Sequence, residues 1–297
     1  NGHDGVTTTP AGVSDVKTFP RRFGPYELHA RIAIGGLFEV FQATRSSSTR
    51  RLALCQVQSF VDEEVLTTMF EDLNLAAQVR HPHLLRLEDF GQLEGHSFVC
   101  TEFVDGFDVR PRKVKASAAV AAEVCAQLCD ALQVAHGMGV VHGDVQPGNV
   151  MISRAGDVKL RELGLARCRR GAMSHRGVLV VPLHYLSPEQ LRGVPQTFAT
   201  DVFSMGLVLF ELVTGRGPFE RGSELGRLKA TLHEPVAPEV MAQVPPPLVP
   251  IVERALQKDP LRRFESAQAM SEALRAAGGP VRKAQLAEWA ATHARQP

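Results

Sequence analysis

The 297-residue sequence is poor in lysine. It has seven lysines among its 33 basic residues, and none lies between Lys17 and Lys113. A lysine ammonium is a common point-charge ligand for phosphate groups. A phosphate site that relies on lysine is therefore excluded from the stretch between these two residues, where only an arginine could take its place.

The sequence also lacks a strong net charge and a long uninterrupted apolar run. Its formal net charge is +1, and 44% of its residues are hydrophobic. A nearly neutral chain gives no reason to expect nucleic acid or an anionic membrane as a partner. We find no apolar run of the roughly 20 residues that span a bilayer and no signal peptide. We therefore expect a cytoplasmic protein without a membrane segment.

Cysteines with the spacing of a disulfide framework or a metal site are absent as well. The chain has five cysteines, an odd and scattered set that is typical of reduced thiols in a cytoplasm. Cys125 and Cys129 are four residues apart in an Ala-rich stretch of helical periodicity. No second ligand pair accompanies them, and the eleven histidines form no ligand pattern. We therefore predict a buried apolar helix face here.

The apolar pattern that is present divides the chain into two parts. Short β-type runs, interrupted by one helical stretch at residues 63–79, predict a small lobe rich in strands. Helical spacing dominates the second part, where "DVFSMGLVLFELVTG" is apolar nearly all round and predicts a buried helix. The expected organisation is a flexible tail over 1–22, an N-lobe over 23–105, a C-lobe over 106–278 and a terminal helix or extension over 279–297.

Six sequence motifs occur in a characteristic order. They are "HPHLLRLEDFG", "VVHGDVQPGNV", "GDVKLRELGLAR", "VPLHYLSPEQLRG", "ATDVFSMGLVLFELVTGRGPF" and "KDPLRRFESAQAM". Together they resemble the eukaryotic-like (Hanks-type) serine/threonine kinases of bacteria, from about Tyr26 to Arg275. The resemblance implies an α+β, bilobal protein-kinase-like fold, with a small β-rich N-lobe carrying one main helix and a larger, mainly helical C-lobe.

The resemblance also implies that the cations which hold phosphate in this family are missing. Cys55 stands at the position of the N-lobe lysine, or Gln56 if the alignment slips by one residue, and Gln146 stands at the position of the catalytic-loop lysine. None of these side chains can neutralise a phosphate. Gly143 replaces the arginine that, in the family, holds a phosphorylated activation segment.

The glycine-rich loop of the family is degenerate in "IAIGGLFEVF". Gly35 matches its second glycine, but Ala33 and Phe38 stand for the first and third. Glycine matters there because backbone N–H groups must approach phosphate closely. The ring of Phe38 either folds into the cleft and partly fills it or lies on the surface of a loop tip. The apolar residues that would sandwich an adenine are retained as Val40, Ala53 and Met151.

Several acidic and amide positions of the family are retained. Asp144 matches the catalytic base, and Asn149 matches a metal ligand. Glu162 stands for the metal-binding Asp, but its extra methylene suits the strict geometry of Mg²⁺ poorly. Asp72 matches the helix acid that pairs with the missing lysine, and we expect it to have no cation to meet. The residues that carry the architecture in the family match Asp201, Glu189 and Arg263.

We interpret the chain as a pseudokinase, a catalytically impaired kinase-like domain that acts as a protein-binding scaffold or an allosteric regulator. The kept acids are then explained by architecture alone. Two alternatives stay open at this point: a weak, atypical ATP-dependent Ser/Thr kinase, and a nucleotide sensor without phosphotransfer. The expected cofactor is none, or weakly bound ATP with Mg²⁺.

The expected partner is another protein. The stretch "ARCRRGAMSHRG" has several arginines and no acid, and guanidinium groups suit carboxylate or phosphate recognition. We predict that it binds an acidic or phosphorylated face, against the alternative of a solvated mobile loop. The predicted residues are Arg167, Arg169, Arg170 and Arg176.

Overall fold

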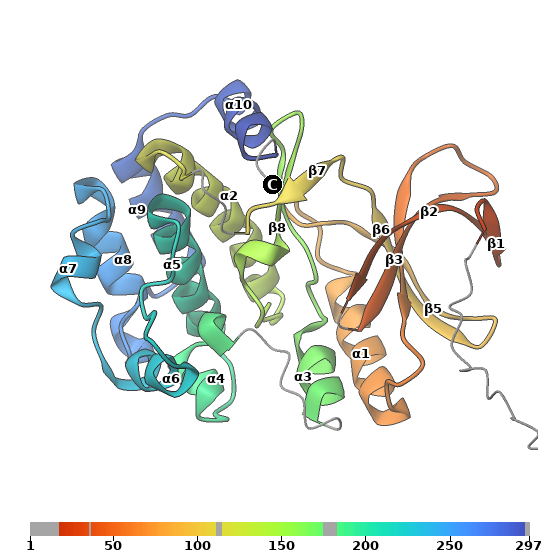
Figure 1. Cartoon of the computed structure of the whole chain (residues 1–297), viewed down its shortest axis with the longest axis horizontal. Helices are drawn as coiled ribbons and strands as arrows, with labels where there is room; N and C mark the ends of the chain where they lie inside the picture. The colour runs from red at the N-terminus through yellow and green to blue at the C-terminus, as the bar shows by residue number, and fades with distance from the viewer. Residues whose placement is uncertain (1–17, 36, 111–114, 175–182, 295–297) are drawn as a thin grey trace, which may run out of the picture.

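The computed structural model describes residues 18–35, 37–110, 115–174 and 183–294 of the chain. It has two lobes (Figure 1), one built on a twisted sheet and the other mainly helical. This arrangement confirms the predicted bilobal fold. The cleft between the lobes brings together residues from both.

The N-lobe is formed by an antiparallel six-stranded sheet of order β1-β2-β3-β4-β6-β5. Alternation of apolar and polar residues explains its two faces: in β2, Tyr26 and Leu28 are buried while Glu27 and His29 are exposed. The strands span Arg21–Phe23 (β1), Tyr26–Gly35 (β2), Phe38–Arg45 (β3), Leu52–Val57 (β4), Leu87–Leu93 (β5) and His96–Glu102 (β6).

The predicted flexible tail over 1–22 is wrong at its C-terminal end. Arg21 and Arg22 belong to β1, where they pair with Leu28 and Glu27 of β2. The strand is held because Phe23 is buried in the core of the sheet. Three residues are too few to produce a recognisable alternation, so the sequence alone does not reveal this strand. Residues 1–17 lie outside the described residues.

The single N-lobe helix, α1, spans Glu63–Ala76 and ends three residues before the predicted boundary. Its first turn carries two acids, which favour the positive end of a helix dipole. The buried residues Val65, Met69, Leu73 and Ala76 recur at helical spacing. The first three pack this helix against the sheet, in a cluster that includes residues of β4 and β6.

The C-lobe is built around α2 (Ala118–Gly137) and α5 (Phe198–Thr214). Residues 200–214 of α5 are buried, which confirms the predicted core helix. Cys125 and Cys129 are buried on α2 as predicted. By length and composition α2 could cross a membrane, contrary to our expectation, but most of it packs in this core. Further α-helices are α3 (Ala166–Ser174), α4 (Pro188–Leu191), α6 (Glu224–His233), α7 (Pro238–Met241), α8 (Val249–Ala255) and α9 (Ala267–Gly278).

The terminal helix α10 (Lys283–Ala294) lies beside a small sheet of order β7-β8-β9 (Figure 1). Its residues Leu286 and Trp289 are buried in the core of the C-lobe, and Lys283 forms an ion pair with Asp157. The predicted extension is therefore an integral layer of the C-lobe. The strands of the small sheet span Gly106–Asp108 (β7), Val150–Ser153 (β8) and Val158–Leu160 (β9).

Candidate functional site

The loop between α2 and β8, residues 138–149, is anchored to the core by one buried aspartate. Each carboxylate oxygen of Asp201 accepts a hydrogen bond of 2.8 Å, one from the backbone N–H of His142 and one from that of Gly143. The ring nitrogen Nε2 of His136 lies 2.8 Å from the same carboxylate. Gly143 has φ +70°, a conformation that favours glycine. The loop is therefore held by α5 whether or not a ligand is present.

A buried ion pair between Arg263 and Glu189 holds α4 to the rest of the C-lobe. The guanidinium of Arg263 donates two hydrogen bonds to Glu189, of 2.7 and 2.9 Å, and a third of 2.8 Å to the carbonyl of Ala199. The hydroxyl of Thr200 donates to the same carboxylate. Nearly all polar groups of this pair are satisfied, as a buried pair requires.

Asp144 is engaged by its own loop. Gln146 Nε2 donates a 2.7 Å hydrogen bond to its carboxylate, and Asn149 Nδ2 donates to the carboxylate at 3.0 Å and to the carbonyl at 2.9 Å. Burial raises the pKa of Asp144, while Arg169 nearby acts in the opposite direction. Gln146, at the position of a lysine in the resembling family, thus binds the acid with a neutral donor.

Arg169 of α3 reaches between the two acids of the cleft. Its Nη2 lies 2.6 Å from an oxygen of Glu162, and its Nε lies 3.9 Å from an oxygen of Asp144. Glu162 has φ +72°, and the backbone turn there aims its carboxylate at α3. A guanidinium from the chain itself therefore lies beside the carboxylates at the catalytic-base and metal-binding positions of the family.

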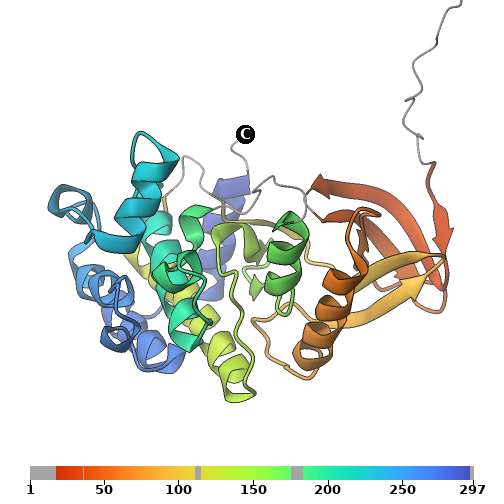
Figure 2. The same ribbon diagram turned by 90° about the horizontal axis from the view of Figure 1, so that it is seen from below.

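The expectation that Asp72 has no cation to meet is wrong. Arg167 of α3 donates hydrogen bonds of 2.8 and 2.6 Å to its two carboxylate oxygens. The pair forms because α3 packs on α1 (Figure 2): Leu165 and Cys168 share a buried cluster with Val65 of α1. The partners are 95 residues apart in sequence, so the motif pattern does not reveal them.

The arginines predicted to bind a partner are mostly occupied within the chain. Arg170 donates to the carbonyl of Gly143 at 3.3 Å. It also donates to the side-chain oxygen of Gln196 at 2.6 Å, when the amide of Gln196 is oriented with its oxygen toward Arg170. Arg167 and Arg169 have the acidic partners described above. Arg176 lies outside the described residues. Partner binding through this segment stays a prediction.

A cavity of about 410 Å³ lies where the family binds nucleotide. The antiparallel register places Val40 opposite Cys55. Phe38 is buried with 5% of its surface exposed and lines the cavity, which supports the occluded alternative for its ring. Burial raises the pKa of the Cys55 thiol to about 12, so it is neutral. The other predicted residues that line the cavity are Gly35, Val40, Ala53, Cys55, Met151, Glu162 and Arg169.

The residues of the cleft do not fit an Mg²⁺–nucleotide group. Glu162, the carboxylate at the metal-binding position of the family, pairs with Arg169 at 2.6 Å. Within the described ranges, no group of three or more His, Cys, Asp and Glu side chains is arranged to hold a metal ion. A triphosphate would meet acids and a neutral thiol, with Arg110, Arg161 and Arg169 as the cations that line the cavity.

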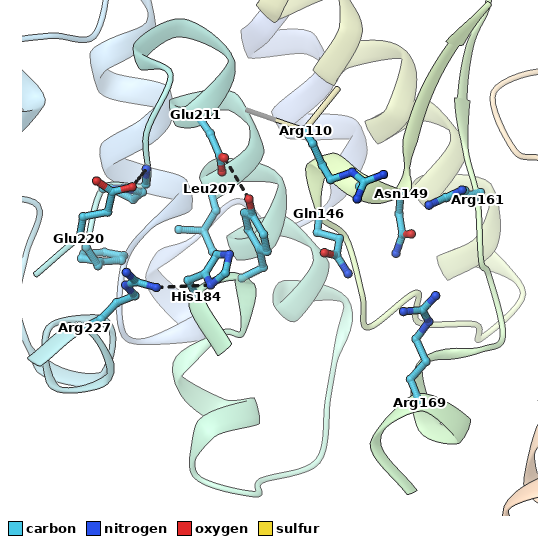
Figure 3. A pocket seen from close by; sticks show the side chains of 15 residues that line it. Arg110, Gln146, Asn149, Arg161, Arg169, His184, Leu207, Glu211, Glu220 and Arg227 are labelled. Atoms are coloured by element: carbon cyan, nitrogen blue, oxygen red, sulfur yellow. Dashed lines mark hydrogen bonds between the residues drawn. The ribbon is translucent and has the colours of Figure 1, made fainter. Parts of the chain in front are cut away.

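A second pocket, of about 630 Å³, lies on the C-lobe side of the same residues (Figure 3). Its cationic side is formed by Arg110, Arg161 and Arg169 beside Gln146 and Asn149. Our sequence reasoning missed Arg110 and Arg161. The only signal was the position of Arg161 directly before Glu162. The opposite side includes Leu207, Glu211, Glu220 and Arg227 (Figure 3), and Tyr185 and Phe219 also line the pocket.

Glu211 provides a test of this pocket through its ionisation. Burial raises its pKa from 4.5 to about 7, although Tyr185 donates a 2.9 Å hydrogen bond to it. Because the folded-state pKa is raised, the stability from this group is complete below 4.5 and is lost as pH rises through about 7. Glu211→Gln keeps an acceptor for Tyr185 and removes the charge. We expect it to raise the free energy of unfolding above neutral pH by on the order of 1–2 kcal/mol.

Urea unfolding of this variant at several pH values checks the expectation. The gain of Glu211→Gln over the wild type should grow between pH 4.5 and 7. Glu253→Gln, at an exposed position, is the matched control and should change stability little at any pH. A gain that is independent of pH would show that the charge of Glu211 is not its cause.

The two lobes, the anchored loop and the cleft acids together define a protein-kinase fold. Residues 26–274 match the family model described as "Protein kinase domain". The chain belongs to this family, and its relatives are bacterial Hanks-type serine/threonine kinases.

Two named relatives illustrate the similarity. Serine/threonine-protein kinase PknA of Mycobacterium tuberculosis is 31% identical, over 85% of this chain and 61% of its own length. The probable serine/threonine-protein kinase PknB of Lactococcus lactis is 28% identical, over 82% of this chain and 40% of its own length. The solved PknI kinase domain of M. tuberculosis has a TM-score of 0.71 at 21% identity, covering 89% of this chain and all of that one. The chain spans less than two thirds of the length of the curated relatives PknA and PknB.

Proposed function

We propose that this kinase-fold domain is a pseudokinase that binds another protein as a scaffold or an allosteric regulator and does not transfer phosphate. The position of Arg169 carries the proposal. Its guanidinium neutralises Glu162 at 2.6 Å and lies near Asp144, where a phosphotransfer site of this family needs Mg²⁺.

The missing cations support the same conclusion. Cys55 is a neutral thiol at the position of the lysine that positions phosphates in the family, and Gln146 has already donated its N–H to Asp144. Removing one preorganised electrostatic group typically costs about 2.7–4 kcal/mol in a transition state. Two such losses are not strictly additive. Together they would still slow phosphate transfer from the rate of a typical kinase to one that is hard to distinguish from background.

The retained residues favour a structural explanation. Asp144 and Asn149 bond to each other, and Asp201 holds the loop backbone. Each performs a role within the fold without a substrate. A protein that keeps this frame and loses the phosphate ligands is suited to present a surface to a partner.

Thermal unfolding with ATP tests the role of Arg169. We expect no stabilisation of the wild type by ATP in EDTA, and little with Mg²⁺, because the cleft acids are already neutralised. Arg169→Ala should gain a Mg²⁺-dependent stabilisation, since it leaves Glu162 and Asp144 without their guanidinium. Arg167→Ala is the matched control: it removes the same charge from the same helix but leaves these two acids paired as before.

Phosphate transfer from γ-labelled ATP provides the second readout. The wild type should incorporate no more label than an Asp144→Asn variant. Tight ATP binding in EDTA, or transfer that Asp144→Asn abolishes, would contradict the proposal and favour a nucleotide sensor or a weak kinase, respectively.

A further inference from the structure

We propose that the pocket lined by Arg110, Arg161 and Arg169 binds a phosphorylated Ser or Thr side chain of a partner protein. The inference rests on the proposed function, because a pocket that holds a phosphorylated segment replaces the transfer site of the kinase fold. The three arginines come from different parts of the chain, the end of β7, the end of β9 and α3, and they meet around Asn149 (Figure 3).

Unsatisfied hydrogen-bond donors are the first argument. The Nε atoms of Arg161 and Arg169 are buried and have no hydrogen-bond partner among the described residues. Their nearest ion-pair contacts, to Glu162 and Asp144, are 3.7 and 3.9 Å long, beyond the range of a hydrogen bond. A buried donor without an acceptor is costly. A ligand that supplies acceptor oxygens here would therefore be favoured.

The balance of charge selects the kind of ligand. Acids face each arginine: Asp108 pairs with Arg110 at 2.8 and 2.5 Å, and Glu162 and Asp144 face Arg169. Because these acids neutralise part of the positive charge of the arginines, the pocket attracts a single carboxylate only weakly. A phosphate monoester carries about 1.5–2 negative charges and three acceptor oxygens. It can meet several guanidinium forks at once, so we infer phosphate rather than an acidic side chain.

The rest of the pocket fits a polypeptide. Its volume of about 630 Å³ exceeds what one phosphate group needs. Phe219 and Pro218 are buried beside the apolar Leu207, and Tyr185 and Gln146 provide polar edges. The cavity that Phe38 lines reaches the same three arginines, so a nucleotide bound there would compete for them, whereas the apolar residues and polar edges just named line only the larger pocket. The chemistry of the larger pocket therefore favours an extended segment with a phosphorylated side chain at the arginine end.

Binding of degenerate peptide pools tests the proposal with the whole chain. The probes are fluorescent pools with a fixed central phosphoserine or phosphothreonine, the same pools with Ser or Thr, and pools with Glu. We expect the phosphorylated pools to bind about 10- to 100-fold tighter than the others. Arg110→Gln together with Arg161→Gln should remove this preference. Arg254→Gln, which changes an exposed arginine outside the pocket, should retain it.

Each other outcome has a defined meaning. Equal binding of all pools would overturn the proposal. So would the absence of binding by the wild type and the variants, provided that their thermal unfolding profiles are the same. Displacement of the phosphopeptide by ATP but not by inorganic phosphate, with tighter binding of ATP, would assign the arginines to a nucleotide instead. Transfer of label from ATP in the same samples would overturn the proposed function and not the peptide site, so the two failures are distinguishable.

Discussion

Arg263→Ala is expected to lower the free energy of unfolding by about 3–5 kcal/mol, because it leaves a buried carboxylate without its partner. The guanidinium donates two hydrogen bonds to Glu189 and further ones to the carbonyls of Ala199 and Gln257. Glu189 and Arg263 are both buried, so the carboxylate cannot regain a water partner without opening the C-lobe. Urea unfolding, followed by circular dichroism, measures the loss.

Arg254→Ala is the matched control. Its side chain is half exposed and pairs with the exposed Glu265 at 3.0 Å, so its loss should cost less than about 1 kcal/mol. Similar losses from both substitutions would contradict the structural role assigned to the buried pair. A loss from Arg263→Ala with no change in the denaturant dependence would show that the domain still unfolds cooperatively.

Asp201→Ala is expected to destabilise the protein by about 3 kcal/mol or more, because two buried backbone donors lose their acceptor at about 1–3 kcal/mol each. These donors are the N–H groups of His142 and Gly143, and His136 loses its partner as well. Hydrogen exchange should report the effect locally. The amides of this loop should exchange faster in the variant under conditions where the rest of the C-lobe stays protected.

Asp105→Ala provides the comparison for this second effect. Asp105 is an exposed acid with ion pairs to Arg154 and Arg51 at the surface, and its removal should change stability by less than about 1 kcal/mol. If the loop amides exchanged at the same rate in Asp201→Ala as in the wild type, the anchoring role would be wrong. The retention of kinase-like acids would then need a catalytic explanation.

Both expected effects explain how a chain can keep part of a kinase signature. Asp201, Glu189 and Arg263 are buried and bonded to the frame of the C-lobe. Substitution at any of them threatens folding, whereas Cys55 and Gln146 occupy positions where a lysine served a ligand in the family. The observed mixture of kept and lost residues follows from this difference in cost.

Much of the fold follows from local pattern and motif order. The strands from Tyr26 to Glu102, the helix that begins at Glu63 and the buried α5 have the predicted type and approximate position. Their apolar periodicity is strong, and it acts over short stretches. The strand β1 was missed because three residues carry no period.

Only the site residues that belong to a recognised motif could be predicted from the sequence. The order of the motifs implies the kinase fold, and that fold places Asp144, Asn149 and Glu162 in one cleft. The arginines of the same cleft could not be placed in this way, because no motif specifies the partner of Arg167 or Arg169. Arg110 and Arg161 belong to the second pocket for reasons that no local pattern contains.

The residues and their order were enough to predict the two lobes, the family, the loss of both phosphate-binding lysines and the retention of the architectural acids. The directions in which the arginines of α3 point depend on the three-dimensional fold. Packing of α3 on α1 brings Arg167 to Asp72 across 95 positions of sequence, and the turn at Glu162 brings that acid to Arg169. Such ion pairs depend on distance and burial in space. The physical reason is that charge attraction acts over a few ångströms, whereas sequence order fixes only the neighbours along the chain.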